Sequence, residues 1–287
     1  MRVVITGAGG QLGQDLVAAF LDAGSHHEIS GFGHDRLDVG NRDAVLQVIG
    51  TVRPDVVVHA GAWTAVDACE ADPDRAYRVN ALGSRHVAEA ARLTGAHVVY
   101  ISTDYVFDGL SDRPYREWDD PNPLSVYGRS KLAGEKEVLA GVPRVAVVRT
   151  SWVFSTHGAN MLKTVLRLSA ERPELAFVDD QRGCPTSTED LARMVVNLSS
   201  ARLPGIFHVT NQGPTTWYQF AREVVAAAGR DPGMVRAIKT ADLQPPRPAP
   251  RPANSVLDNS ALRLQGMPLL PDYHEPLERA VKQLEAT

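Results

Sequence analysis

The 287-residue sequence predicts an α/β protein, in which a doubly wound parallel sheet carries a second, smaller α/β domain. Short runs rich in Val and Ile are hydrophobic almost without interruption, which is typical of strands buried on both faces. These runs alternate with segments of helical periodicity, and repeated strand–helix units form parallel sheets through right-handed crossovers. The alternation weakens after residue 151, where we expect the smaller domain to begin.

The expected strands of the sheet are 2–6, 28–32, 55–60, 97–102 and 144–150. The helices expected between them are 10–22, 41–52, 72–94 and 125–140. Further along, the patterns predict helices at 157–172, 188–199 and 216–228, and a core strand at 205–210. The sheet domain is therefore expected to hold 1–150 and about 188–210, and the smaller domain about 151–187 and 211–287.

The proline-dense run "PPRPAPRP" at 245–252 is expected to be a loop, because proline disrupts helices and central strands. It either connects two elements on the surface or rims a ligand pocket.

The composition is that of an ordinary globular protein, with 44% hydrophobic and 22% charged residues. A net charge of −4 argues against a nucleic-acid partner. No run approaches the roughly 18 apolar residues of a membrane span, and "MRVVITGAGG" does not resemble a signal peptide. Cys69 and Cys184 lie outside any CxxC motif and are expected to be unpaired. These features predict a cytoplasmic protein without a membrane partner.

The first expected strand runs into "ITGAGGQLG", which spaces Gly7, Gly10 and Gly13 evenly before an amphipathic helix. Glycines there permit a tight turn and close backbone approach, and the helix N-terminus favours a pyrophosphate. We therefore predict a dinucleotide site, the alternative being a glycine-rich turn without a ligand.

The residues expected to hold the adenosine follow strand 28–32. No acid stands at the tip of strand 28–32, Asp35 comes late, and Arg36 could accept a 2′-phosphate. The pattern favours NADPH, with NADH as the alternative. Asp38 could either reach the adenine amino group or cap helix 41–52.

Four polar residues follow strand 97–102 directly or end it: Ser102, Thr103, Asp104 and Tyr105. The carboxyl ends of parallel strands are where such sheets bind ligands. Tyr127 could donate a proton there, and Lys131, one helical turn later, could lower the pKa of that tyrosine. The alternative is an ordinary solvated pair on a helix.

The motifs "TGAGGQLG", "STDYVFDG" and "YGRSKLAGE" together resemble the extended short-chain dehydrogenase/reductase superfamily. The further motifs "WTAVDACE", "RTSWVF", "DQRGCPT" and "RPANSVLD" narrow the resemblance to the dTDP-4-dehydrorhamnose reductase family. It extends from residue 1 to about 258, and "LLPDYHEPLERAVKQL" resembles the closing helix of the family. The resemblance implies a Rossmann-like cofactor domain and a smaller α/β substrate-binding domain.

The resemblance also implies roles for individual residues. The catalytic positions are Thr103, Tyr127 and Lys131. The cofactor positions are Gly7, Gly10, Gln11, Leu12, Gly13, Asp38, Val39, Ala62, Trp63 and Thr64, together with Tyr127 and Lys131. The substrate positions are Thr103, Asp104, Tyr105 and Trp152. Trp63 departs from the family, whose members usually carry tyrosine or histidine there.

Some members of the family bind Mg²⁺ between two protomers through three acids, and the matching positions are Asp15, Glu189 and Glu275. Asp15 is one methylene shorter than the usual glutamate, and scattered acids are commonly surface charges. The resemblance is compatible with a homodimer.

The implied activity is NADPH-dependent reduction of the C4 keto group of dTDP-4-dehydro-6-deoxy-L-mannose, giving dTDP-L-rhamnose. A dehydratase would need an Asp-Glu pair after Thr103, whereas Asp104 and Tyr105 stand there. The alternatives left open are a nucleotide-sugar epimerase and an NADP-binding regulatory subunit resembling that of methionine adenosyltransferase.

The motifs "DQRGCPT" and "RPANSVLD" each allow two interpretations, one structural and one functional. "DQRGCPT" forms either a structural corner or part of a pocket, and Cys184 in it is expected to be a small filler rather than a nucleophile. Arg251 and Asn254 either face the substrate diphosphate or tie down their loop.

Overall fold

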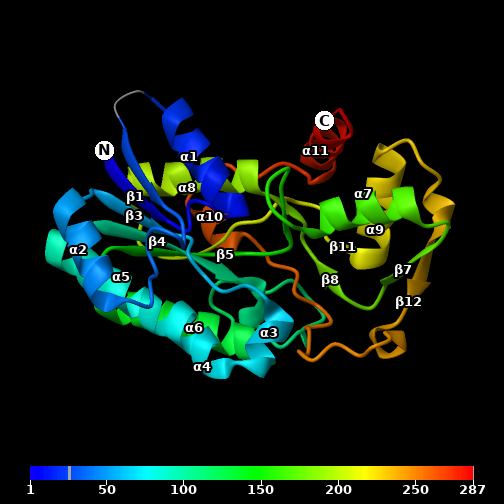
Figure 1. Cartoon of the computed structure of the whole chain (residues 1–287), viewed down its shortest axis with the longest axis horizontal. Helices are drawn as coiled ribbons and strands as arrows, with labels where there is room; N and C mark the ends of the chain where they lie inside the picture. Colours follow the sequence, from blue (N-terminus) through cyan, green and yellow to red (C-terminus); the bar gives the residue numbers. More distant parts are fainter. Residues whose placement is uncertain (25–26, 287) are drawn as a thin grey trace.

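The computed structural model describes residues 1–24 and 27–286, which form a parallel sheet flanked by helices and a second, smaller unit (Figure 1). The six strands lie in the order β10-β5-β4-β3-β1-β2, and every neighbouring pair is parallel. Their bounds are β1 (Arg2–Thr6), β2 (Glu28–Phe32), β3 (Val56–His59), β4 (His97–Thr103), β5 (Val145–Thr150) and β10 (Gly205–His208). The predicted doubly wound sheet is confirmed.

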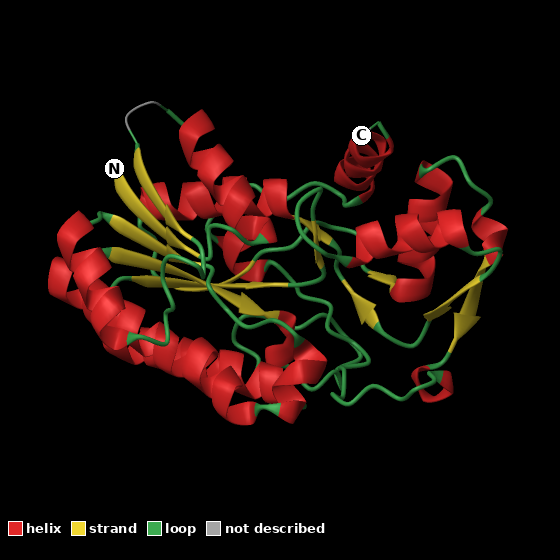
Figure 2. Ribbon diagram, in the orientation of Figure 1, coloured by secondary structure: helices red, strands yellow, loops and turns green. Residues whose placement is uncertain are grey.

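Helices cover both faces of the sheet (Figure 2). On one face lie α1 (Gln11–Asp22) and α8 (Thr188–Ala201). On the other lie α2 (Arg42–Val52), α5 (Gly83–Thr94) and α6 (Val126–Gly141). Successive strand residues point to opposite faces, so Val3 and Ile5 pack under α1 while Val4 packs on the other side. This two-sided burial explains the unbroken hydrophobicity of the strand sequences.

The segment expected as one helix, 72–94, is three consecutive pieces behind the short helix α3 (Val66–Ala71). Helix α4 (Pro73–Tyr77) begins where the Asp72 side chain accepts a hydrogen bond from the Arg75 amide at 3.0 Å. A π-helical turn, η1 (Arg78–Leu82), then leads into α5. Such turns often accompany functional sites, and this one carries Asn80, whose contacts reach the site described below.

The second unit has its own apolar core, to which Phe154, Leu162 and Phe220 belong. Its helices are α7 (Met161–Glu171), α9 (Trp217–Ala227) and α11 (His274–Glu285). Its strands pair two by two, as β6 (Val153–Phe154) with β9 (Thr186–Ser187), β7 (Leu175–Val178) with β12 (Val235–Ile238), and β8 (Arg182–Gly183) with β11 (Thr215–Thr216). The sequence patterns do not predict these short pairings.

The remaining elements are short. They are three 3₁₀ turns, η2 (Asp104–Val106), η3 (Pro232–Met234) and η4 (Thr240–Asp242), and the helix α10 (Ser260–Leu264). Residues 245–252 form a loop, as predicted. Leu262 and Leu270 pack in the core under α1 and α8, so the chain returns to the first unit inside the range expected for the second. Within the described residues no helix has the length and apolarity of a membrane span.

Candidate active site

Two adjoining hollows lie along the carboxyl edge of the sheet, where β1, β3, β4 and β5 end. One has a volume of about 600 Å³ and the other about 450 Å³, and both are lined by Gly7, Gly10, Ala60 and Ala62. Every residue predicted above for catalysis, cofactor or substrate lines one or both of them. Segments up to about 145 residues apart in the sequence therefore meet where the resemblance places the site.

The loop after β1 has the geometry of a phosphate cradle. Gly7 has φ +72°, and a Cβ there would lie 2.7 Å from the Gly61 nitrogen. A Cβ on Gly13 would lie 2.1 Å from the Gly7 carbonyl oxygen, so both positions require glycine. Helix α1 starts after Gly10 with no side-chain cap and no acid in its first turn, which leaves its first N–H groups available to an anion. These residues fit a dinucleotide pyrophosphate.

The adenosine side of the larger hollow combines acids and bases. Asp38 accepts from the Gly40 amide at 2.9 Å and pairs with Arg78 at 3.0 Å. The alternative that Asp38 caps α2 is wrong, because the Asn41 side chain accepts from the Ala44 amide and fills that role.

Side chains not predicted for the adenosine side also line it, namely His34, Arg75 and Arg78. Asp35 lines it too, whereas Arg36 does not and instead lies over the Phe32 ring. The sequence could not identify Arg75 and Arg78 as site residues, because exposed arginines are common on any helix and 72–94 has a helical pattern.

Trp63, the departure from the family pattern, is held at its backbone. Its amide donates to the Asn80 side-chain oxygen at 2.8 Å, and the Asn80 side-chain nitrogen donates to its carbonyl at 3.1 Å. The Arg75 guanidinium lies over the indole at 4.4 Å. Asn80 also donates to Ser130 on α6 at 2.9 Å, so one buried side chain links the cofactor segment to the helix that carries Tyr127.

Tyr127 stands in the first turn of α6, where Ser125 caps the helix by accepting from the Gly128 amide at 3.1 Å. Its ring is buried, and burial raises the pKa of Tyr127 above its ordinary value, although a hydrogen bond with Thr103 opposes the rise. Thr103 in turn donates to Asp104 at 3.0 Å. Burial raises the pKa of Asp104 to about 7. The two predicted hydroxyl groups therefore lie together.

Lys131 is buried one turn further along α6. Its ammonium donates to the Ile101 carbonyl at 2.7 Å and lies 4.2 Å from the centre of the Tyr100 ring. Burial lowers the pKa of Lys131 to about 7, and the charge of Glu135 opposes that change. Burial dominates the pKa of Tyr127, and the hydrogen bond with Thr103 opposes the rise. That Lys131 lowers the pKa of this tyrosine stays a prediction.

On the substrate side, the Trp152 ring lies between Trp217 and Gly183. Its backbone has φ +47°, and its ring stacks on Trp217 with 3.6 Å between centroids and 5° between planes. A Cβ on Gly183 would lie 2.4 Å from the Trp152 ring, so "DQRGCPT" shapes the pocket wall. Cys184 is buried, and burial raises the pKa of its thiol to about 11, which suits a filler. Trp217 is a site residue that the sequence analysis missed.

A third hollow, of about 670 Å³, adjoins the second at Tyr105 and Trp217 and is rimmed by arginines. The proline-dense loop supplies Arg247 and Arg251. Asp67 on α3 anchors this loop, since it accepts from Arg251 at 2.8 and 2.9 Å, from the Ala249 amide at 3.2 Å, and lies 3.5 Å from Arg247. The loop thus rims a pocket.

Arg251 and Asn254, the two residues of "RPANSVLD" with open roles, have different roles in the structure. Arg251 faces the arginine-rimmed hollow. Asn254 donates to the Ser111 carbonyl at 2.9 Å and ties down its own loop. Both cysteines are free, as predicted.

The three acids predicted to bind Mg²⁺ have other partners. Asp15 accepts from Thr188 and lies 3.4 Å from His157, while Arg279 pairs with Glu275 at 3.0 Å and with Glu189 at 3.5 Å. Residues 1–24 and 27–286 contain no cluster of three His, Cys, Asp or Glu side chains able to hold a metal ion. The chain by itself gives the Mg²⁺ prediction no support, because arginine already neutralises two of the acids.

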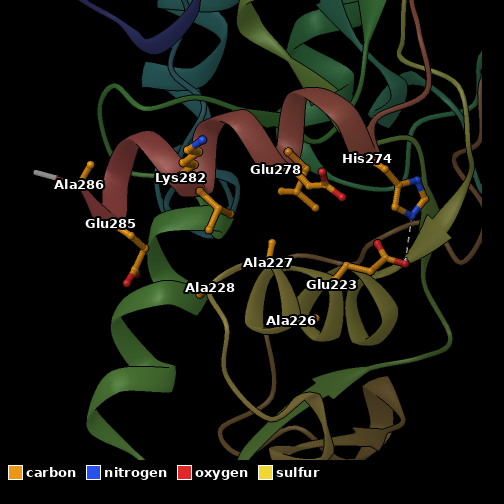
Figure 3. A pocket seen from close by; sticks show the side chains of 11 residues that line it. Glu223, Ala226, Ala227, Ala228, His274, Glu278, Lys282, Glu285 and Ala286 are labelled. Atoms are coloured by element: carbon orange, nitrogen blue, oxygen red, sulfur yellow. Dashed lines mark ion pairs between the residues drawn. The ribbon is translucent and has the colours of Figure 1, made fainter.

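A separate hollow of about 720 Å³ lies between α9 and α11 (Figure 3). Small residues, Ala226, Ala227 and Ala228, lie on its α9 side, and Glu223 pairs across it with His274 at 3.4 Å. None of the predicted site residues lines this hollow.

Comparison with known proteins agrees with this geometry. The family model described as RmlD substrate binding domain matches residues 1–286. A dTDP-4-dehydrorhamnose reductase of Streptomyces griseus is 41% identical, covering 99% of this chain and 94% of its own length. A probable dTDP-4,6-dihydroxy-2-methyloxan-3-one 4-ketoreductase of Streptomyces antibioticus is 40% identical, covering 100% of this chain and 96% of that protein.

Among solved structures, the dTDP-4-dehydrorhamnose reductase of Bacillus anthracis in complex with NADP superposes with a TM-score of 0.94. It is 39% identical, and the match covers 98% of this chain and 99% of that one. With the sequence motifs, the sheet and the clustered residues in agreement, the chain belongs to the RmlD substrate binding domain family.

Proposed function

We propose that this protein is an NADPH-dependent reductase that converts the C4 keto group of dTDP-4-dehydro-6-deoxy-L-mannose to the alcohol of dTDP-L-rhamnose. The observation that carries the proposal is the meeting of Thr103, Tyr127 and Lys131 in one hollow that continues into the phosphate cradle of Gly7, Gly10 and Gly13. This is the last step in making dTDP-L-rhamnose.

The cofactor proposal rests on fit. Gly7, Gly10 and the uncapped first turn of α1 would hold the pyrophosphate, and Arg75 and Arg78 give the adenosine side positive charge suited to a 2′-phosphate. The relative from Bacillus anthracis is in complex with NADP. NADPH is therefore the preferred cofactor, with NADH as the weaker one.

When bound, NADPH supplies the hydride. The hydroxyl of Thr103, once it turns from Asp104, can donate a hydrogen bond to the substrate carbonyl oxygen, which orients and polarises it. Tyr127 gives its proton to the same oxygen as negative charge develops there. Its raised pKa keeps Tyr127 protonated at neutral pH, and the ammonium of Lys131 would stabilise the negative charge left on the phenolate oxygen.

The substrate would extend from this centre toward the second unit. Trp152, stacked on Trp217, presents an aromatic wall for the deoxy-sugar. The hollow beyond carries Arg172, Arg247 and Arg251, and its one acid, Glu174, is paired with Arg236 at 2.5 Å. Positive charge of this kind suits the diphosphate of a nucleotide sugar.

A second candidate has the same chemistry with a different sugar. The relative from Streptomyces antibioticus is named as a 4-ketoreductase of another dTDP-linked sugar and is 40% identical, close to the 41% of the Streptomyces griseus enzyme. Both candidates need the same acid and the same cofactor cradle, so they differ only in the walls of the substrate hollow.

The test is NADPH oxidation by the purified chain with dTDP-4-dehydro-6-deoxy-L-mannose, with Tyr127→Phe as the matched variant. We expect oxidation with dTDP-L-rhamnose as product, and a loss of ~10²–10⁴-fold in Tyr127→Phe because the general acid is removed. Product formation without net NADPH consumption would indicate the epimerase. Binding of NADPH without turnover of any dTDP-keto sugar would favour the regulatory-subunit alternative.

A further inference from the structure

A buried ion pair lies directly beneath the catalytic helix, and the mechanism above does not use it. Glu135 on α6 accepts two hydrogen bonds from Arg149 on β5, at 2.7 and 3.0 Å. The side chains are only 2% and 1% exposed for Arg149 and Glu135 respectively. Ser102 at the end of β4 donates a third hydrogen bond to the same carboxylate at 2.5 Å. One carboxylate thus joins α6 to two strands at their carboxyl ends.

Glu135 follows Lys131 by four residues, so the two side chains lie on one face of α6. The Lys131 ammonium is buried, and burial without an opposing charge favours the neutral amine. The ammonium donates its hydrogen bond to the Ile101 carbonyl, which carries no net charge. An opposite charge on the same helix face is therefore what keeps this ammonium charged.

The other titratable groups around Lys131 do not supply that charge. His59 on β3 is buried, and burial lowers its pKa to about 3, so it is neutral. Burial raises the pKa values of Tyr100 on β4 and Tyr127 on α6, so both stay neutral. Asp104, after β4, has a pKa of about 7 and is only partly ionised. Arg149 lies beyond Glu135 and adds positive charge.

Arg149 and Ser102 together also fix the position of the Glu135 carboxylate. Both of its oxygens accept charge-assisted hydrogen bonds from Arg149, and one of them also accepts from Ser102. Ser102 precedes Thr103 in β4, so the same contact fixes the strand end that carries the substrate-facing hydroxyl.

We infer that Glu135, held by Arg149 and Ser102, is a positioning residue that keeps Lys131 charged and in place at working pH. The inference rests on the proposed reductase function for its kinetic consequence, but not for its test by titration. Lys131 must be charged to stabilise the phenolate, so activity is full below the pKa of Lys131 and falls as the pH rises through it. Removing the negative charge of Glu135 lowers that pKa and moves the fall toward acid.

The first measurement is a direct titration of the lysines in the whole chain. The sequence has five lysines, at positions 131, 136, 163, 239 and 282, so labelling with [ε-¹³C]lysine gives a simple NMR spectrum. We expect one signal to titrate about three units below the ordinary lysine value of about 10.4 and to disappear in Lys131→Arg. In Glu135→Gln this signal should titrate about one unit lower still.

The second measurement is the pH profile of kcat/KM with NADPH and the keto sugar. In Glu135→Gln the alkaline fall of kcat/KM should begin about one pH unit lower. The variant should therefore be about tenfold less active than the parent at pH values above the fall and nearly as active as the parent below it. The matched control is Glu137→Gln, since Glu137 is paired with Arg85 at 2.7 Å on the exposed part of the same helix. That variant should leave the profile unchanged.

A uniform loss of rate in Glu135→Gln, with neither the NMR signal nor the alkaline fall displaced, would overturn the inference and leave only a structural role. Should Glu135→Gln fail to fold, the double change Glu135→Gln/Arg149→Met removes the buried pair as a unit and carries the same test. Its signal should still move toward acid, because the charge that shifts Lys131 is that of Glu135. A displaced NMR signal in a chain that reduces no sugar would count against the proposed function alone.

Discussion

The cofactor side and the substrate side of the site are built in different ways. The cofactor side is shaped by backbone, with Gly7 and Gly13 packed so closely that a single Cβ would overlap main-chain atoms. The substrate side is shaped by side chains that reach across from other segments, such as Trp152 against Trp217 and Arg251 against Asp67. The first arrangement leaves little room for change, whereas the second can be altered one side chain at a time.

This difference suits the two ligands. A pyrophosphate offers the same oxygens in every dinucleotide, and a backbone cradle recognises it without any particular side chain. Sugars differ in their hydroxyl groups, and distinguishing them needs adaptable walls. Two relatives named for different dTDP-linked sugars, at 41% and 40% identity to this chain, are consistent with that division.

Substituting one glycine on the cofactor side and one on the substrate side should give the largest effects on ligand binding, each confined to its own side. Gly13→Ala puts a Cβ 2.1 Å from the Gly7 carbonyl and must displace the cradle, so we expect NADPH affinity to fall about 100-fold. Gly183→Ala puts a Cβ 2.4 Å from the Trp152 ring, so we expect the KM for the sugar to rise while NADPH affinity is kept. Fluorescence titration with NADPH and steady-state kinetics measure both, and a loss of NADPH affinity in Gly183→Ala would break the comparison.

Asp67→Asn should act on the substrate side alone, with an intermediate effect. Asp67 anchors the loop 245–252 through Arg251, Arg247 and the Ala249 amide, and a neutral amide cannot hold two guanidinium groups. We expect the KM for the sugar to rise about tenfold, since the loss of a charged hydrogen bond costs about 1.5 kcal/mol, while the KM for NADPH stays constant.

A matched control for that change is Asp119→Asn, because Asp119 forms a similar two-bond pair with Arg113. That variant should leave both KM values near those of the parent. An equal rise of both KM values in Asp67→Asn would show that the loop serves the whole cleft rather than the substrate side.

Arg75→Ala should give the smallest effect, and it sharpens the comparison by testing a side chain on the cofactor side. Arg75 lies over Trp63 and lines the adenosine hollow. We expect the KM for NADPH to rise about fivefold and that for NADH to stay the same, since an exposed charged contact contributes about 1 kcal/mol. Equal changes for the two cofactors would indicate that Arg75 supports the Trp63 ring and does not contact a 2′-phosphate.

The same difference explains how much the sequence could predict. Strand 2–6 was predicted at its observed bounds, because a buried parallel strand has a continuous apolar run. The glycine cradle was predicted because its residues are neighbours in sequence. The pairing of β7 with β12 and the stacking of Trp217 on Trp152 join segments about 60 residues apart, and no local pattern marks them.

Charges were the hardest features to predict. The sequence shows Lys131 four residues before Glu135 but does not show that Arg149 pairs with that glutamate. It likewise presents Asp15, Glu189 and Glu275 as candidate ligands without the arginines that neutralise the last two. Whether a charge is buried, and what faces it, depends on tertiary packing.

The place of β10 at the edge of the sheet has a consequence for any attempt to divide the protein. The strand comes from residues 205–208, after the chain has left the sheet to build β6, α7 and β7 and has returned through α8. A fragment ending at residue 150 would expose the unpaired edge of β5 and the apolar side of α1 on which α8 packs, both of which invite aggregation. Substrate preference therefore cannot be exchanged between relatives at a single junction; a graft must replace two separate stretches together and leave 188–208 in place.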